Sequence, residues 1–459
     1  MPSPSLQTLA VRGPSWLRLG GAALIACAAL SPAAALDLTE AYRLALDNDA
    51  TVRAARAAAD AQRERLPQAR AQLLPNVGAS LARAHNDLTR TQANILGQPV
   101  TSDERYYSKN ASLTLRQPLY RPALWAALEQ ARAVVADADA TLQAELDNLG
   151  PRVASAYFEA LYAHDQLALV REQVRVAQIQ LDAAVKAWQA GTGTRTDVDE
   201  VQARLDLLRA DELRARQQLD FTRHGLRALI DREPDALAVL DPQLLVLSPP
   251  QPLDLDAWVA KAEQGNPTLQ ALRARVQVAE QEVRRAQAGH LPTLDAYAQV
   301  THSASENVTT PSSRYTNRSV GVQFNLPLYA GGGVNSATRQ AMAELTRAQE
   351  TLQATRRDLG VRLHREYRAI TEGIERVRAL ERAVAAAEQA VISNQRSYEA
   401  GVRTVLDVLN AQQQRQTALR DLAQARYEVL LARVRLMALA GENVEAEIER
   451  INAALRAQP

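Results

Sequence analysis

Two short segments of the sequence each combine a glycine turn with hydroxyl, carboxylate or guanidinium side chains. The first segment holds Gly191, Gly193, Thr196 and Asp197, and the second holds Tyr398, Gly401, Arg403, Asp407 and Asn410. A carboxylate in such a setting can pair with a guanidinium, bind a cation, or accept hydrogen bonds from backbone N–H groups at a helix start. The residues themselves leave the choice between an ionic link and a helix cap open. No nucleophile stands beside a base, so they do not predict catalysis.

Other reactive residues are sparse. The chain has 459 residues with six His and one Cys, and the His residues show no metal-ligand spacing. The glycine run at 331–333 is not followed by Lys and Ser or Thr, which argues against a phosphate-binding loop. Lys and Arg (53) nearly balance Asp and Glu (52), so no nucleic-acid partner is expected. We therefore expect a protein that is not an enzyme, with no cofactor and no metal.

The N-terminus has the features of a secretory signal peptide, residues 1–35. Arg12 and Arg18 precede an apolar stretch at 19–30. The alanines at 33–35 offer a cleavage site. The alternative is that Cys27, at the end of a Leu-Ile-Ala-Cys segment, becomes a lipidated first residue. No later apolar stretch reaches the roughly 18 to 20 residues of a membrane helix. Any membrane embedding must therefore use strands.

The sequence contains a tandem duplication with a period of about 210 residues. Asp37 corresponds to Asp254 and Tyr157 to Tyr367, and the glycine turns correspond as well. Between the two copies lies a Pro-rich stretch that is typical of a linker. The predicted units are a signal peptide at 1–35, a first repeat at 36–230, a linker at 231–253, a second repeat at 254–440 and a tail at 441–459.

Alternating apolar and polar residues predict two strands in each repeat. The expected strands cover about 75–85, 107–119, 291–301 and 315–328. One apolar and one polar face is the pattern of a barrel strand between lipid and a wet lumen, although a half-exposed soluble sheet has the same pattern. Because about eight strands are the minimum for a membrane barrel, four strands per chain predict a barrel shared by two or three copies.

A very long helix follows each strand pair. From Leu128 to Trp188, small and apolar residues recur at alternating spacings of four and three, as in a coiled coil. One extra spacing of four, from Leu142 to Leu146, forms a stutter. About 65 helical residues span on the order of 100 Å. The order of each repeat is thus helix, strand, strand, long helix, turn and helix. The alternative is a secreted or surface-associated structural coiled-coil protein.

Together these features resemble the TolC-like outer membrane efflux family over nearly the whole mature chain. The markers are segment 325–333, Asn-Leu-Pro-Leu-Tyr-Ala-Gly-Gly-Gly, and segment 398–410. The resemblance implies a mainly α protein with a membrane β-barrel sector. Three chains would form a twelve-stranded barrel in the outer membrane of a Gram-negative bacterium and a long periplasmic α-helical tunnel. The implied function is a passive export duct of a tripartite efflux or type I secretion system.

The resemblance also implies a gate at the periplasmic end of the coiled coils. Its links would join Tyr398 and Arg403 of the second repeat to Thr196 and Asp197 of the first. Asp407 would line the constriction, and Asn410 stands where the family has a second Asp, which predicts weaker cation block. The turns at Gly191, Gly193 and Gly401 would dock a periplasmic adaptor. The implied partners are two further copies of the chain, that adaptor, an inner-membrane ABC or proton-driven transporter, and outer membrane lipid.

Overall fold

The computed structural model describes residues 35–234, 236–305 and 312–456. The predicted signal peptide lies outside this part except for its last residue, and so does Cys27. Cleavage and lipidation therefore stay predictions.

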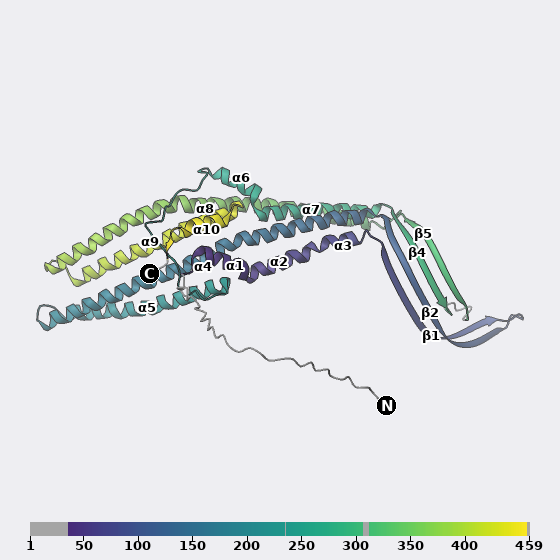
Figure 1. Ribbon diagram of the computed structural model, residues 1–459, viewed down its shortest axis with the longest axis horizontal. Helices are drawn as coiled ribbons and strands as arrows, with labels where there is room; N and C mark the ends of the chain where they lie inside the picture. The colour runs from purple at the N-terminus through teal and green to yellow at the C-terminus, as the bar shows by residue number, and fades with distance from the viewer. Residues whose placement is uncertain (1–34, 235, 306–311, 457–459) are drawn as a thin grey trace, which may run out of the picture. The chain divides into compact units, whose positions relative to one another are not determined.

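Each repeat contains short helices, two strands, one very long helix and a returning helix, which confirms the predicted order (Figure 1). The first repeat consists of α1 (Leu38–Asn48), α2 (Ala50–Arg63), α3 (Arg65–Ala71), β1 (Asn76–Ala93), β2 (Pro99–Tyr120), α4 (Pro122–Gln189) and α5 (Arg195–Ile230). The second consists of α6 (Leu255–Gly265), α7 (Pro267–Gln287), the 3-10 turn η1 (Ala288–His290), β4 (Thr293–Ala304), β5 (Arg314–Asn325), α8 (Gly333–Glu399) and α9 (Val405–Ala440).

Equivalent polar contacts recur at equivalent positions of the two repeats. The Asp49 carboxylate caps the N-terminus of α2, and the Asn266 side chain caps that of α7, each by accepting a backbone N–H. The hydroxyl of Tyr157 donates to the backbone carbonyl of Leu36, just before α1. The Tyr367 hydroxyl donates to a carbonyl in the same position before α6. The duplication thus extends from the sequence to individual hydrogen bonds.

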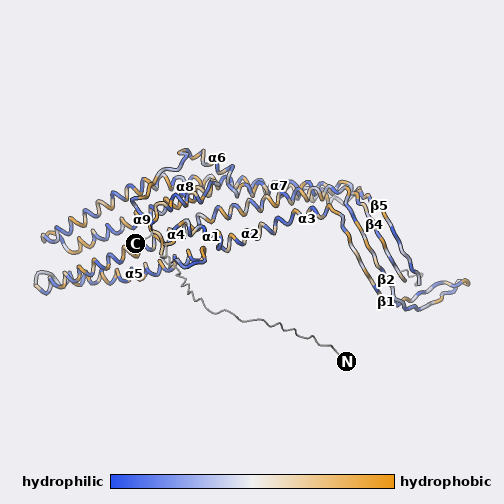
Figure 2. Tube along the Cα trace, viewed as in Figure 1, coloured by the Kyte–Doolittle hydropathy of each residue, from blue (hydrophilic) through white to orange (hydrophobic). Residues whose placement is uncertain are grey.

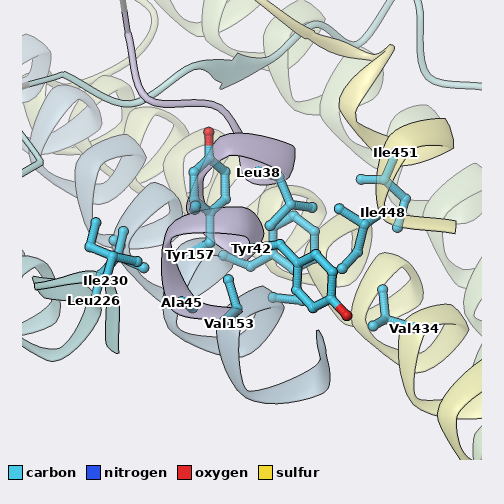
Figure 3. Packing of buried hydrophobic residues seen from close by; sticks show 14 of the residues in the cluster. Leu38, Tyr42, Ala45, Val153, Tyr157, Leu226, Ile230, Val434, Ile448 and Ile451 are labelled. Atoms are coloured by element: carbon cyan, nitrogen blue, oxygen red, sulfur yellow. The ribbon is translucent and has the colours of Figure 1, made fainter. Parts of the chain in front are cut away.

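Two apolar cores hold the helices together. The first is shared by α1, α4, α5 and α9, and Figure 3 shows Leu38, Tyr157, Ile230 and Val434 converging there from these four helices. The second gathers side chains of α6, α8 and α9, with Trp258 fully buried among them. Since α9 contributes to both cores, it ties the two repeats into one body.

The predicted linker and tail fold against each other. A short strand in the linker, β3 (Val239–Leu240), pairs with β6 (Leu455–Arg456) near the C-terminus. Between α9 and β6, α10 (Val444–Asn452) buries three aliphatic side chains in the first core. There Val444 approaches α4 so closely that a Cβ on Gly150 would lie 2.2 Å from its Cγ1 atom. The glycine is therefore needed for this contact.

The four longer strands form one antiparallel sheet in the order β1-β2-β4-β5. β1 and β2 extend beyond the predicted bounds, and β4 pairs with β2 only from Lys109 onward. The residues beyond that point form a two-stranded ribbon of mainly polar composition, which hydrophobic alternation does not detect. Within the described residues, the outer edges of β1 and β5 have no partner strand.

A buried carboxylate joins the sheet to the long helices. Asp295 of β4 is 3% exposed and accepts hydrogen bonds from two guanidinium groups. Arg116 of β2 donates at 2.7 Å, and Nε of Arg121, the residue before α4, also donates at 2.7 Å. A buried carboxylate with two such partners has its charge compensated. The start of α4 is thereby fixed to two strands.

The long helices pair within each repeat, α4 with α5 and α8 with α9, and further contacts join α4 to α7 and α9. Figure 2 shows apolar and polar residues alternating at short intervals along all four helices, as expected for coiled-coil seams. Among the described residues, no helix combines the length and apolar character required to cross a membrane.

Candidate functional site

The candidate site lies at the turns between the paired long helices. In the first turn, Gly191 has a φ of 74°, a left-handed conformation that favours glycine. The N–H groups of Thr192 and Gly193 both donate to the carbonyl of Ala187 at the end of α4. This wrapped turn satisfies the last helical carbonyl groups and reverses the chain within a few residues.

The second turn repeats this geometry. Gly401 has a φ of 71°, and the N–H groups of Val402 and Arg403 both donate to the carbonyl of Ser397. The three glycines predicted as docking turns thus lie at the two tips, and Gly191 and Gly401 occupy equivalent positions. Gly191 and Gly401 are exposed and Gly193 is partly covered.

Both predicted carboxylates cap the helix that returns from the tip. Asp197 accepts the N–H of Thr194 at 3.0 Å, while its own N–H donates to the Thr194 hydroxyl at 3.1 Å. Asp407 and Thr404 form the same reciprocal capping box at 3.0 and 3.3 Å. The helix-cap alternative left open by the sequence therefore describes what these carboxylates do here.

Asp407 has a further cationic partner. The Arg403 guanidinium lies 3.4 Å from its second oxygen. The hydrogen bond from the Thr404 N–H, followed by that from the Thr404 hydroxyl, lowers the pKa of Asp407, and Arg403 lowers it further. The carboxylate is therefore ionised throughout the neutral range and remains charged in mild acid.

The two tips lie side by side. Near the tips, Val201 and Leu205 of α5 are fully buried in a cluster that also contains Val405 and Leu409 of α9. Further along, the Arg204 guanidinium of α5 donates to the side chain of Gln413 in α9. A groove of about 390 Å³ runs beside this contact between the two coiled coils.

The four residues predicted to form gate links do not bond across the tips in this arrangement. Tyr398 and Thr196 are exposed, and Asp197 and Arg403 are engaged within their own tips. Among the described residues, the polar contact between α5 and α9 is instead that of Arg204 and Gln413, which sequence reasoning missed. Their separation of 209 residues, close to the repeat period, is the signal that places them at the same level of the two coiled coils.

Asp407 and Asn410 are three residues apart on α9, so their side chains share one helix face. Asp407 is partly buried and Asn410 is exposed. Such a face can attract a mobile cation, because an exposed carboxylate keeps its negative charge. Its weak ion pairs also exchange readily with water. The described residues contain no group of three or more His, Cys, Asp or Glu positioned to hold a metal ion.

The sheet has one apolar face and two open edges, and it is fixed to long paired helices that end in tight turns. This combination is typical of the protomer of an outer membrane channel. The chain belongs to the outer membrane efflux protein family, whose model matches residues 41–231 and 258–442. The two matched segments correspond to the two repeats. The chain is therefore an outer membrane export channel, and the structural coiled-coil alternative is set aside.

Similar proteins support the same conclusion. The chain is 34% identical over 421 residues to the alkaline protease secretion protein AprF of Pseudomonas aeruginosa, covering 91% of this chain and 87% of the relative. It is 32% identical over 434 residues to the proteases secretion protein PrtF of Dickeya chrysanthemi, covering 93% of each. The crystal structure of the outer membrane protein VceC of Vibrio cholerae has the same fold, with a TM-score of 0.74 at 20% identity, covering 89% of this chain and 96% of VceC.

Proposed function

We propose that three copies of the chain assemble into one export duct, with a closed twelve-stranded barrel and a helical tunnel. The observation that carries this proposal is the pair of open edges on β1 and β5. An edge exposed to lipid leaves backbone groups unpaired at several kcal/mol each, so each edge requires a strand from another copy. β1 and β5 run in opposite directions within the sheet, so β5 of one copy can continue antiparallel pairing with β1 of the next.

The helix tips form the gate of this duct. Exposed ion pairs are worth about 0 to 1 kcal/mol each and helix caps about 0.5 to 2 kcal/mol, which suits contacts that must exchange when a partner protein binds. Links from Tyr398 and Arg403 to Thr196 and Asp197 belong to the closed state, in which Arg403 leaves Asp407. Asp407 lines the constriction and Asn410 contributes no charge to it. The turns at Gly191, Gly193 and Gly401 dock a periplasmic adaptor.

The duct itself is passive and performs no catalysis. An inner-membrane transporter, of the ABC or proton-driven type, supplies the energy, and the adaptor joins it to the tips. A polypeptide is the cargo we favour, because two similar proteins are named for the secretion of proteases. Export of small toxic compounds through the same walls is the second candidate.

Deleting the gene tests both candidates. For a polypeptide cargo, one or more proteins disappear from the culture medium and return when the gene is restored, while sensitivity to toxic compounds stays within about twofold. An unchanged set of secreted proteins together with increased drug sensitivity would contradict the polypeptide cargo and support efflux of small compounds. A control strain carries the Gly360→Ala variant, because Gly360 has open space around it.

A further inference from the structure

Strand pairing assigns each side chain of the sheet to one of two faces, because directly opposed residues in antiparallel strands point the same way. One face carries an apolar row of Val77, Leu115, Ala298 and Val320. The other face is polar. Ser303 on the polar face is fully buried, whereas Val320 is 87% exposed. Side chains crowd on a concave face and splay on a convex one, so the apolar face is the convex, lipid-facing side.

The convex face ends in a row of positive charge. Arg83 of β1 is directly opposite Lys109 of β2, which is opposite Ala304 of β4, which is opposite Arg314 of β5. Arg318 lies on the same face of β5, four residues further along. All four cationic side chains are exposed. Three cations thus occupy one row of the sheet, with only the small Ala304 between them.

Within the described part of the chain, no acidic side chain pairs with these cations. Among the described residues, Lys109, Arg314 and Arg318 form no ion pair, and Arg83 lies over the ring of Tyr107 at 4.8 Å from the ring centre. Like charges directly opposite each other destabilise a strand pair. The row of Arg83 and Lys109 is therefore costly unless an anion binds to it.

Among the residues that the structure describes, the acidic side chains nearest on the same face already have partners. Asp87 forms an ion pair with Arg105 at 3.1 Å. Asp103 accepts a hydrogen bond from the Thr89 hydroxyl at 2.7 Å. The positive charge of Arg83, Lys109 and Arg314 thus lies at the level where the apolar face ends, whereas the ribbon beyond it carries both signs of charge on this face.

We propose that Arg83, Lys109 and Arg314 bind the phosphate groups of a phosphorylated glycolipid in the outer leaflet of the outer membrane. The other end of β2 leads into α4, so this end of the sheet points away from the helices and toward the cell exterior. Acyl chains pack on the apolar rows, and the phosphates reach the cations at the boundary. Guanidinium groups suit this task because they bind phosphate with two parallel hydrogen bonds.

This inference rests on the proposed barrel, so the experiment examines both. The full-length mature protein is purified and its lipid affinity is measured by native mass spectrometry with diphosphorylated lipid A. The same glycolipid without phosphates and inorganic phosphate serve as further probes. The test variant carries Arg83→Gln, Lys109→Gln and Arg314→Gln. The matched control is Arg105→Gln, which removes a cation from the same face that already has a partner.

We expect the triple variant to bind the diphosphorylated lipid about 100-fold more weakly, since each cation near an anionic surface contributes about a factor of five. The control is expected to bind within twofold of the unmodified protein. Equal affinity of the triple variant, or equal affinity for the phosphate-free glycolipid, overturns the proposal. If inorganic phosphate at the same concentration as the lipid displaces it completely, the ligand of the site is free phosphate and not the lipid.

Conductance in planar bilayers separates the two proposals. The triple variant is expected to conduct like the unmodified protein, because the changed residues face away from the lumen. If the unmodified protein forms no channel, the proposed duct fails whatever the lipid affinities are. If channels form but the affinities do not differ, only the lipid site fails.

Discussion

Replacing Asn410 with Asp is expected to tighten cation block of the channel strongly. The new carboxylate lies one helical turn from Asp407 on an exposed face of α9. In a trimer the change adds three negative charges to the constriction. Because Asp407 remains ionised, the added charges complete a second ring rather than replace the first.

The magnitude follows from Coulomb's law. A divalent cation about 5 Å from one carboxylate gains about 1.7 kcal/mol in water, and physiological salt screens this to about half. The three chains together then contribute about 2.7 kcal/mol, or about a 100-fold lower blocking concentration. A narrow lumen has a lower effective dielectric constant than bulk water, which makes this figure a lower bound.

The assay is single-channel conductance in planar bilayers. Increasing concentrations of a divalent cation are added on the side of the bilayer from which the long helices extend. Asn410→Gln is the matched control, because it keeps a neutral amide of similar shape, and its block is expected to equal that of the unmodified protein. If Asn410→Asp changes the blocking concentration by less than about threefold, the reasoning is refuted, since Asn410 then does not face the conducting path.

Three further outcomes are expected. Cation block persists from pH 7 to about pH 5, because hydrogen bonds lower the pKa of Asp407. The stability that its helix cap contributes is likewise present above the pKa of the unfolded state. It is lost only as the pH falls through the lower pKa of the folded state. Titrating the block tests this, and half-loss near pH 6 would contradict it. Tyr157→Phe leaves the Ala238 carbonyl without its hydroxyl donor and lowers the free energy of unfolding by about 1 to 3 kcal/mol; an unchanged urea midpoint would speak against it. Gly150→Ala forces Val444 to move and costs about 1 to 3 kcal/mol, whereas Gly360→Ala at the equivalent, open position stabilises by up to about 1 kcal/mol. Equal effects of the two glycine changes would refute the packing argument.

Much of the fold could be predicted because apolar residues recur at regular spacings along the long helices. The tandem duplication repeats this pattern in a second copy. The helix order and the four strands follow from periodicity over long segments, and the second repeat checks the first. The ribbon beyond Lys109 and the strands β3 and β6 were missed for a different reason. Their pairing is fixed by backbone geometry and tertiary contact, and their side chains carry no apolar alternation to detect.

The positions of the two helix turns could be predicted, but the contacts of the side chains around them could not. Glycine turns and following carboxylates locate both tips, because only a few residue types reverse a helix pair tightly. The partner of each carboxylate was not determined by the sequence, since Asp407 can accept from its own helix N-terminus or from a neighbour. The contact between Arg204 and Gln413 depends on how two coiled coils lie against each other, which no local pattern encodes.

If each chain supplies one third of a shared barrel, new cysteines on the edge strands of neighbouring copies can be joined by disulfide bonds. The chain's single Cys lies in the predicted signal peptide, so a mature protein with one new Cys on β1 and one on β5 gives a clean readout. Val320→Cys is combined in turn with Val77→Cys, Ala79→Cys and Leu81→Cys to sample the register between copies. At least one pair is expected to oxidise in the membrane to a covalent trimer. A series that yields only monomers, or a covalent dimer as the closed species, would contradict it.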